Sequence, residues 1–106
     1  MAAGFVKVAR TDEIPEGQAR VYEIEGLRIV VCHVEEGFYA IEDVCTHDES
    51  PFGNEELVGS MIECPRHGAR FDVRTGQVLR MPAVAPVRTF ETRVEGSDVL
   101  VNIEDV

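Results

Sequence analysis

The sequence predicts an all-β fold, a small β-sandwich or barrel that carries a loop-rich insertion. Apolar and polar residues alternate with a period of two over several short stretches. β-Branched and aromatic residues are concentrated in these stretches, and turn residues separate them. Residues 45–86 differ, because they hold four of the five prolines and show little sustained periodicity. We therefore expect strands on both sides of an irregular segment.

Several strands are expected before residue 45. Residues 11–17 (TDEIPEG) form an acidic, turn-rich link, and residues 35–37 (EEG) form a turn. The expected strands are FVKVA (5–9), ARVYEIEG (19–26), the β-branched run LRIVVCHV (27–34) and FYAIEDV (38–44).

The end of the chain predicts a hairpin. Residues 87–95 and 98–104 read as strands, and Gly96-Ser97 between them reads as a two-residue turn. Within the insertion, NEEL after Gly53 suggests a short helical turn in the range 48–57.

Length and charge limit the classes of function. The 106 residues suit one domain, 1–106, with the irregular part at about 45–86. The net charge of −10 argues against nucleic acid and against anionic membrane surfaces as partners. It permits docking to a basic patch on another protein. With no signal-peptide pattern and no apolar run long enough to span a bilayer, we expect a soluble cytoplasmic protein.

Two short clusters of metal-binding residue types lie in the insertion. Cys45 and His47 form the first, Cys64 and His67 the second, and sixteen residues separate His47 from Cys64. Zinc accepts two cysteines and two histidines, but zinc fingers usually pair cysteine with cysteine at a spacing of two to four residues. Here each cluster contains one cysteine and one histidine. This arrangement fits better if the two side chains of a cluster bind different metal atoms. A [2Fe–2S] cluster offers two irons, one for the thiolates and one for the imidazoles.

These residues resemble the Rieske [2Fe–2S] motif, C-x-H followed by C-x-x-H, and the flanks FYAIEDVCTH and LVGSMIECPRHGARFDVRTGQV resemble Rieske ferredoxins. The resemblance implies a Rieske-type fold and one [2Fe–2S] cluster. It implies that Cys45 and Cys64 bind the inner iron, and that His47 and His67 bind the outer iron near the surface. It also implies that Pro82 and Pro86 belong to a loop that covers the cluster.

The loop residues bear on the reduction potential. High-potential Rieske proteins carry a disulfide between the two ligand loops and a serine and a tyrosine after the second loop. The matching positions here are Ser50 and Arg66, and Ala69 and Phe71. Hydrogen-bond donors near the cluster stabilise its reduced form. We therefore expect a potential toward the low end of the Rieske range of roughly −150 to +300 mV.

The resemblance implies an electron-transfer protein rather than an enzyme. Such a carrier takes electrons from a flavin-dependent ferredoxin reductase and passes them to a terminal oxygenase. The alternatives are a small subunit or accessory electron-transfer protein of nitrite reductase or iron–sulfur assembly systems, and a redox-sensing interaction module.

Three further residues receive separate interpretations. Cys32 is expected to be a small buried hydrophobe, and His33 a strand residue on an exposed or half-exposed face. Arg66 lies between two expected ligands, so we expect it near the cluster, where it helps to dock a partner.

Overall fold

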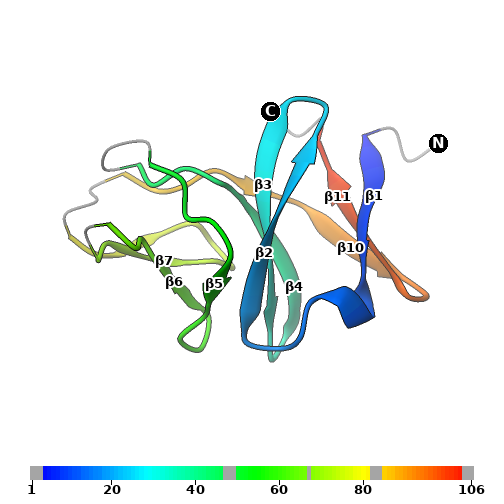
Figure 1. Cartoon of the computed structure of the whole chain (residues 1–106), viewed down its shortest axis with the longest axis horizontal. Coiled ribbons are helices and arrows are strands. Elements are labelled where there is room, and N and C mark those ends of the chain that lie inside the picture. Colours follow the sequence, from blue (N-terminus) through cyan, green and yellow to red (C-terminus); the bar gives the residue numbers. More distant parts are fainter. Residues whose placement is uncertain (1–3, 47–49, 67, 82–84, 104–106) are drawn as a thin grey trace.

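The computed structural model describes residues 4–46, 50–66, 68–81 and 85–103 as three small antiparallel sheets (Figure 1). The first sheet, here sheet A, has the order β1 (Phe5–Arg10), β11 (Asp98–Asn102), β10 (Thr92–Glu95). The central sheet B has the order β5 (Glu55–Glu56), β2 (Gln18–Ile24), β3 (Leu27–Val34), β4 (Gly37–Glu42), β9 (Thr89–Phe90). Sheet C has the order β6 (Met61–Glu63), β7 (Arg70–Asp72), β8 (Val78–Arg80).

Sheet B lies between the other two sheets, and β3 shows why its sequence is so apolar. Val30, Cys32 and Val34 join one buried cluster, whereas Ile29 and Val31 join another. Since successive side chains of a strand point to opposite faces, β3 is covered on both sides. The first cluster lies toward sheet C, and the second lies toward sheet A.

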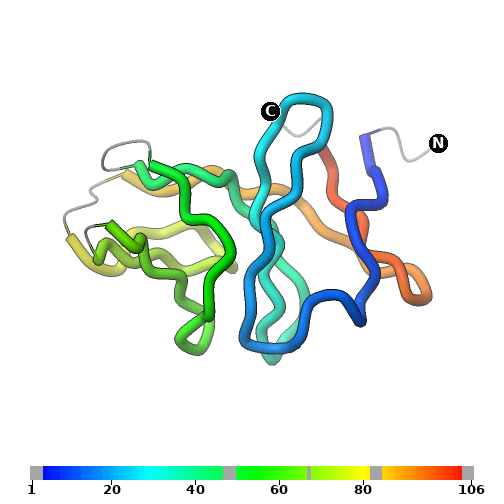
Figure 2. The backbone as a smooth tube through the Cα atoms, in the orientation of Figure 1, coloured from blue at the N-terminus to red at the C-terminus, as the bar shows by residue number. Residues whose placement is uncertain are grey.

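The path of the chain explains how sheet C is held. Figure 2 shows the chain continuing after β4 through β5 at the edge of sheet B, then building sheet C, and returning through β9. On the return, the turn between β7 and β8 packs against the chain just before β9. The N–H of Val87 donates to the carbonyl oxygen of Gly76 at 2.9 Å. A Cβ atom on Gly76, whose φ is +81°, would lie 2.3 Å from the Val87 oxygen, so the contact requires glycine.

Most strand predictions are confirmed. The range 27–34 coincides with β3, and the predicted turn at Gly96-Ser97 joins β10 to β11, where Glu95 pairs with Asp98. The link 11–17 contains a single turn of 3-10 helix, η1 (Thr11–Glu13). The predicted strand 87–95 is divided into β9 and β10, which belong to different sheets.

The expected helical turn in 48–57 is wrong. Among the described residues of that range, Glu55–Glu56 form β5 and pair with Gln18 and Ala19 of β2. A strand of two residues has no periodic signal of its own, and its pairing partner lies far away in the sequence.

Candidate functional site

The two candidate cysteines begin two loops of similar construction. The N–H of Cys45 donates to the carbonyl oxygen of Ser50, and the N–H of Cys64 donates to that of Ala69, both at 2.7 Å. Each hydrogen bond joins a cysteine to the residue five positions later, so each closes a loop of the same length. We call residues 45–50 the first loop and residues 64–69 the second loop.

Both cysteine side chains point into the same buried region. Cys45 and Cys64 have no exposed surface, carry no disulfide, and belong to the apolar cluster between sheets B and C. Two thiols held in one water-poor region from two loops form a suitable donor pair for an iron that is shielded from solvent.

His47 and His67, the other two candidate ligands, lie outside the described residues, as do Asp48, Glu49 and Pro82. Among the residues that are described, no three His, Cys, Asp or Glu side chains gather where a metal ion could bind. The structure therefore describes the thiol half of the candidate set.

Sheet C forms the base of the second loop. β6 and β7 run antiparallel, with Glu63 opposite Arg70, so the loop is the connection of a hairpin. Across this pair, Arg70 Nε donates to Glu63 Oε1 at 2.7 Å. The ion pair closes the base of the loop beside Cys64.

The first loop is closed at its base by Asp43, whose side chain has no exposed surface. Its Oδ1 accepts the N–H groups of Phe52 at 2.8 Å and Gly53 at 3.1 Å. Its Oδ2 accepts two donors of Arg28, Nε at 3.0 Å and Nη2 at 2.8 Å. The sequence gives one signal for this residue, a carboxylate in an otherwise mainly apolar strand just before Cys45, and our sequence interpretation missed it.

Two contacts connect the first loop to its surroundings. Thr46 Oγ1 donates to the carbonyl oxygen of Ala85 at 2.6 Å, which brings the segment before β9 to the first loop. Phe52, which follows the loop, meets Phe71 of β7 edge to face. Both rings are buried in the cluster that contains the two cysteines.

The surface around the loops is partly apolar. Met81 is 77% exposed and Leu79 is 48% exposed. The pairing of Arg70 with Arg80 places the end of β8 beside the end of the second loop. Pro65 and Arg66 within that loop are also exposed.

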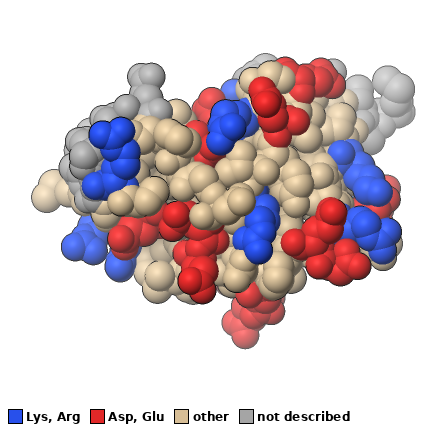
Figure 3. Space-filling model, in the orientation of Figure 1, with Lys and Arg blue, Asp and Glu red and all other residues tan. Residues whose placement is uncertain are grey.

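Charge is divided unequally along the chain. Residues 45–86 contain four basic and six acidic residues, whereas the remainder contains six basic and fourteen acidic residues. Figure 3 shows basic side chains at the end formed by sheet C. The candidate site therefore lies in the less acidic part of the protein.

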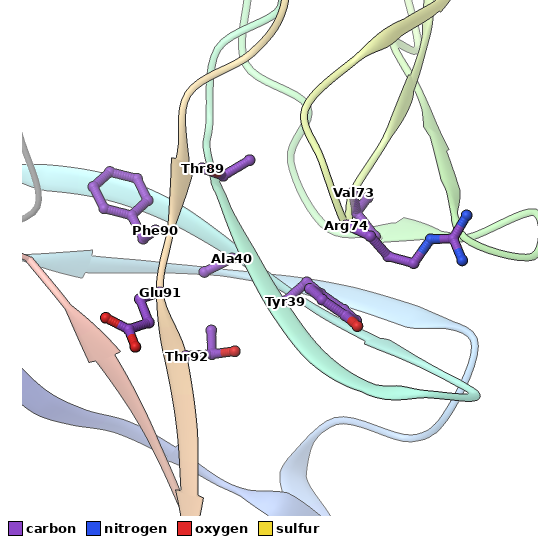
Figure 4. A pocket seen from close by; sticks show the side chains of 8 residues that line it. All are labelled: Tyr39, Ala40, Val73, Arg74, Thr89, Phe90, Glu91 and Thr92. Atoms are coloured by element: carbon purple, nitrogen blue, oxygen red, sulfur yellow. The ribbon is translucent and has the colours of Figure 1, made fainter.

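A groove of about 490 Å³ lies apart from the two loops (Figure 4). It is lined from β4, from the stretch of chain that includes β9, and from the turn after β7, and it includes Tyr39, Arg74 and Glu91. Arg74 is engaged elsewhere, because its guanidinium pairs with Asp72 and with Glu36 at 3.0 Å. None of the predicted site residues lines this groove.

Cys32 and His33 are placed as predicted. Cys32 is fully buried, and burial raises the pKa of its thiol to about 12. His33 is half-buried, stacks on Phe38 with ring centroids 4.0 Å apart, and has Nδ1 2.7 Å from the carbonyl oxygen of Ile14. That carbonyl needs a donor, which places a proton on Nδ1.

Among the described residues, no helix is both long enough and apolar enough to cross a bilayer.

Comparison with known proteins gives one consistent result. The family model for the Rieske [2Fe-2S] domain matches residues 4–91. The ferredoxin component of biphenyl 2,3-dioxygenase from Rhodococcus jostii (strain RHA1) is 36% identical over 100 residues, which are 94% of each chain.

Solved structures agree with the sequence relatives. The ferredoxin of carbazole 1,9a-dioxygenase from Nocardioides aromaticivorans IC177 superimposes with a TM-score of 0.85 at 35% identity, covering 93% of this chain and 97% of that chain. A chain in a complex of reduced oxygenase and oxidized ferredoxin of carbazole 1,9a-dioxygenase gives a TM-score of 0.87 at 34% identity, covering 93% of each chain.

Proposed function

Because the chain belongs to the Rieske [2Fe-2S] domain family, we propose that it is an electron carrier of a multicomponent oxygenase system rather than an enzyme. The observation that best supports this proposal is the pair of matching loops, each of which begins with a fully buried cysteine. When bound, the cluster supplies a one-electron couple. The chain's own residues hold it, keep water away from its thiolate side and present its other side to a partner.

Cys45 and Cys64 would hold the inner iron, and His47 and His67 the outer iron. The burial of both thiols beside Phe52 and Phe71 supports the first half of this assignment. The second half rests on the sequence spacing, since each histidine follows its cysteine within the same loop. A neutral imidazole bound through one nitrogen keeps an N–H that can face a partner. The loops of residues 45–86 would thus form the cluster-binding part of one domain, 1–106.

The first test asks whether the protein holds this cluster. Purified protein should contain two irons and two sulfides per chain, and the reduced form should give an EPR signal with an average g below that of all-cysteine ferredoxins. Cys64→Ser should abolish the signal, whereas Cys32→Ser should keep it, because Cys32 lies outside both loops. A colourless protein that binds zinc would contradict the proposal.

The partners follow from the relatives, which are named as ferredoxin components of dioxygenase systems. We infer that a flavin-dependent reductase supplies the electrons and that a terminal oxygenase receives them. The complex of an oxygenase with a related ferredoxin supports the second inference. The reductase and oxygenase of a biphenyl or carbazole dioxygenase system should turn over when this protein replaces the natural ferredoxin. No product above a ferredoxin-free control would count against this role.

The partners are expected to dock at the sheet C end. Exposed Met81 and Leu79 offer apolar contact there, and Arg66 adds a positive charge within the second loop. Met81→Ser and Arg66→Ala should slow electron transfer to the oxygenase while the cluster content stays unchanged. The matched control is Val94→Ser on β10, an equally apolar exposed residue in sheet A. Equal rates for Met81→Ser and Val94→Ser would exclude this docking surface.

A further inference from the structure

Asp43 carries a carboxylate whose side chain has no exposed surface. A buried carboxylate is costly unless it is paired and its oxygens are hydrogen-bonded. Here both oxygens are used, Oδ1 by two backbone N–H groups and Oδ2 by two donors of Arg28. In addition, the N–H of Asp43 donates to the carbonyl oxygen of Arg28 at 2.9 Å. Asp43 is therefore fixed to β3 through both its backbone and its side chain.

These contacts join the two arms of the first loop. Asp43 lies two residues before Cys45, and Phe52 lies two residues after Ser50. The carboxylate thus holds the entering and leaving chains together, just outside the hydrogen bond between Cys45 and Ser50. Phe52 then carries the connection to Phe71 of β7, beyond the second loop. Through Phe52, Asp43 contributes to the placement of both loops.

Asp43 also brings a negative charge close to the proposed cluster. Two residues of chain span at most about 7 Å, so the Cα atoms of Asp43 and Cys45 cannot be farther apart than that. Salt screens charges over about 10 Å at ordinary ionic strength, and it screens buried charges even less. A lone carboxylate at this position would oppose the addition of an electron to the cluster. The Arg28 guanidinium, which binds it through two nitrogens, offsets that charge.

We infer that the Arg28–Asp43 ion pair has two roles. It positions the first loop, and the charge of Arg28 prevents the Asp43 carboxylate from lowering the reduction potential of the cluster. The inference rests on the proposed function, since it requires the [2Fe–2S] cluster. It assigns Asp43 and Arg28 as positioning residues that act through the first loop and contribute no ligand atom. It follows that removing the Asp43 carboxylate and removing the Arg28 guanidinium must shift the reduction potential in opposite directions.

The experiment measures the reduction potential of the wild type and of four variants, each as the intact holoprotein, by EPR-monitored titration. Arg28→Gln leaves the carboxylate unneutralised and should lower the potential. Asp43→Asn removes the negative charge, keeps an oxygen that can accept from Phe52 and Gly53, and should raise the potential. The double variant should return close to the wild-type value. Arg28→Lys keeps the positive charge and should shift the potential less than Arg28→Gln.

The matched control is Arg93→Gln, an arginine on β10 in sheet A that pairs with Glu95 and stacks on Phe5. It should leave the potential unchanged. If Asp43→Asn fails to retain the cluster, the inference is tested by comparing Arg28→Gln with Arg28→Lys, of which Arg28→Gln should shift the potential more. Raising the salt concentration should leave most of the shift in Arg28→Gln in place, because the Asp43 side chain is buried and salt screens buried charges less.

Two results separate the failure of this inference from the failure of the proposed function. This inference alone is overturned if the protein holds the cluster but Arg28→Gln and Asp43→Asn shift the reduction potential in the same direction. It is also overturned if Arg28→Gln shifts the potential no more than Arg93→Gln does. A wild-type protein that holds no [2Fe–2S] cluster overturns both. A merely structural ion pair would lower the melting temperature in both single variants without opposite shifts of the potential.

Discussion

Phe52 meets Phe71 edge to face, with ring centroids 5.5 Å apart and an angle of 88° between the ring planes. The two residues come from opposite sides of the candidate site, one after the first loop and one after the second. Edge-to-face pairs are favourable beyond the area they bury. This contact therefore joins the chain segments that follow the two loops.

Phe71→Ala should destabilise the fold by about 3–5 kcal/mol, because it leaves a cavity in the buried cluster between sheets B and C. Denaturant unfolding measures the change in free energy. Phe5→Ala, a partly exposed ring in sheet A, is the control and should cost less. Equal losses for the two variants would contradict the central position given to Phe71.

Gly76→Ala should cost about 1–3 kcal/mol more than Gly26→Ala, because its Cβ would collide with the Val87 carbonyl oxygen. The two glycines have similar φ angles, +81° and +85°, so both variants bear the same backbone strain. Of these two glycines, Gly26 has open space where a Cβ atom would lie, and Gly76 does not. The difference in unfolding free energy thus isolates the packing of the β7–β8 turn against the returning chain. If the two variants are equally stable, that contact adds nothing to the free energy of unfolding.

Ala69→Ser should raise the reduction potential, because its hydroxyl would add a donor at the end of the second loop. The wild-type potential should lie in the lower part of the range of about −150 to +300 mV given for Rieske centres. Protein-film voltammetry measures both values. Ala9→Ser places the same hydroxyl in the buried cluster next to sheet A and should have no effect on the potential. A wild-type potential near the top of the range would refute the argument from missing hydroxyls.

Asp72→Asn should destabilise the protein at neutral pH and much less in acid. The side-chain hydrogen bond from Arg74 holds the pKa of Asp72 below its ordinary value. A carboxyl whose folded-state pKa is depressed contributes stability that is present above its unfolded pKa, about 4, and is lost as the pH falls through the lower folded value. Unfolding free energies of both forms between pH 7 and pH 3 should converge at the acid end. A pH-independent difference would assign the effect to the backbone contacts of Asp72 instead.

Cys32 should resist alkylation in the folded protein at about pH 8, because its buried thiol has a pKa of about 12 and only the thiolate reacts. Mass spectrometry after treatment with iodoacetamide should find Cys32 modified only when the protein is unfolded beforehand. Rapid labelling of the folded holoprotein at Cys32 would show that this part of β3 opens readily.

The long strands could be predicted because their local pattern agrees with their final environment. In β3, β-branched residues fill both faces, and both faces are buried, so local preference and tertiary packing agree. In β11, the alternation of the sequence matches the burial of Val99 and Val101 on one face.

The short strands of the insertion could not be predicted. β6, β7 and β8 have three residues each, which is too few for alternation to be recognised. Their existence depends on pairing, for example of Ile62 with Phe71, and not on local preference. The division of 87–95 at Glu91 also has a tertiary cause, because β9 pairs with β4 whereas β10 pairs with β11.

The four candidate ligands stay a sequence prediction, which rests on the type and spacing of their side chains, since metals require few residue types. The residues that support them could not be predicted. The sequence marks Asp43 only as a carboxylate in a mainly apolar stretch, and it does not show that Arg28, fifteen residues earlier, folds against it. The contact of Thr46 with Ala85 spans an even longer separation.

The pairing of β1 with β11 has a practical consequence. Phe5 lies opposite Asn102, so the first and last described strands are neighbours in sheet A, while sheet C occupies the other end of the molecule (Figure 1). A fusion partner, an affinity tag or an electrode linker attached at either terminus would therefore leave sheet C uncovered. Tethering this protein to a surface should therefore orient it with the first and second loops outward.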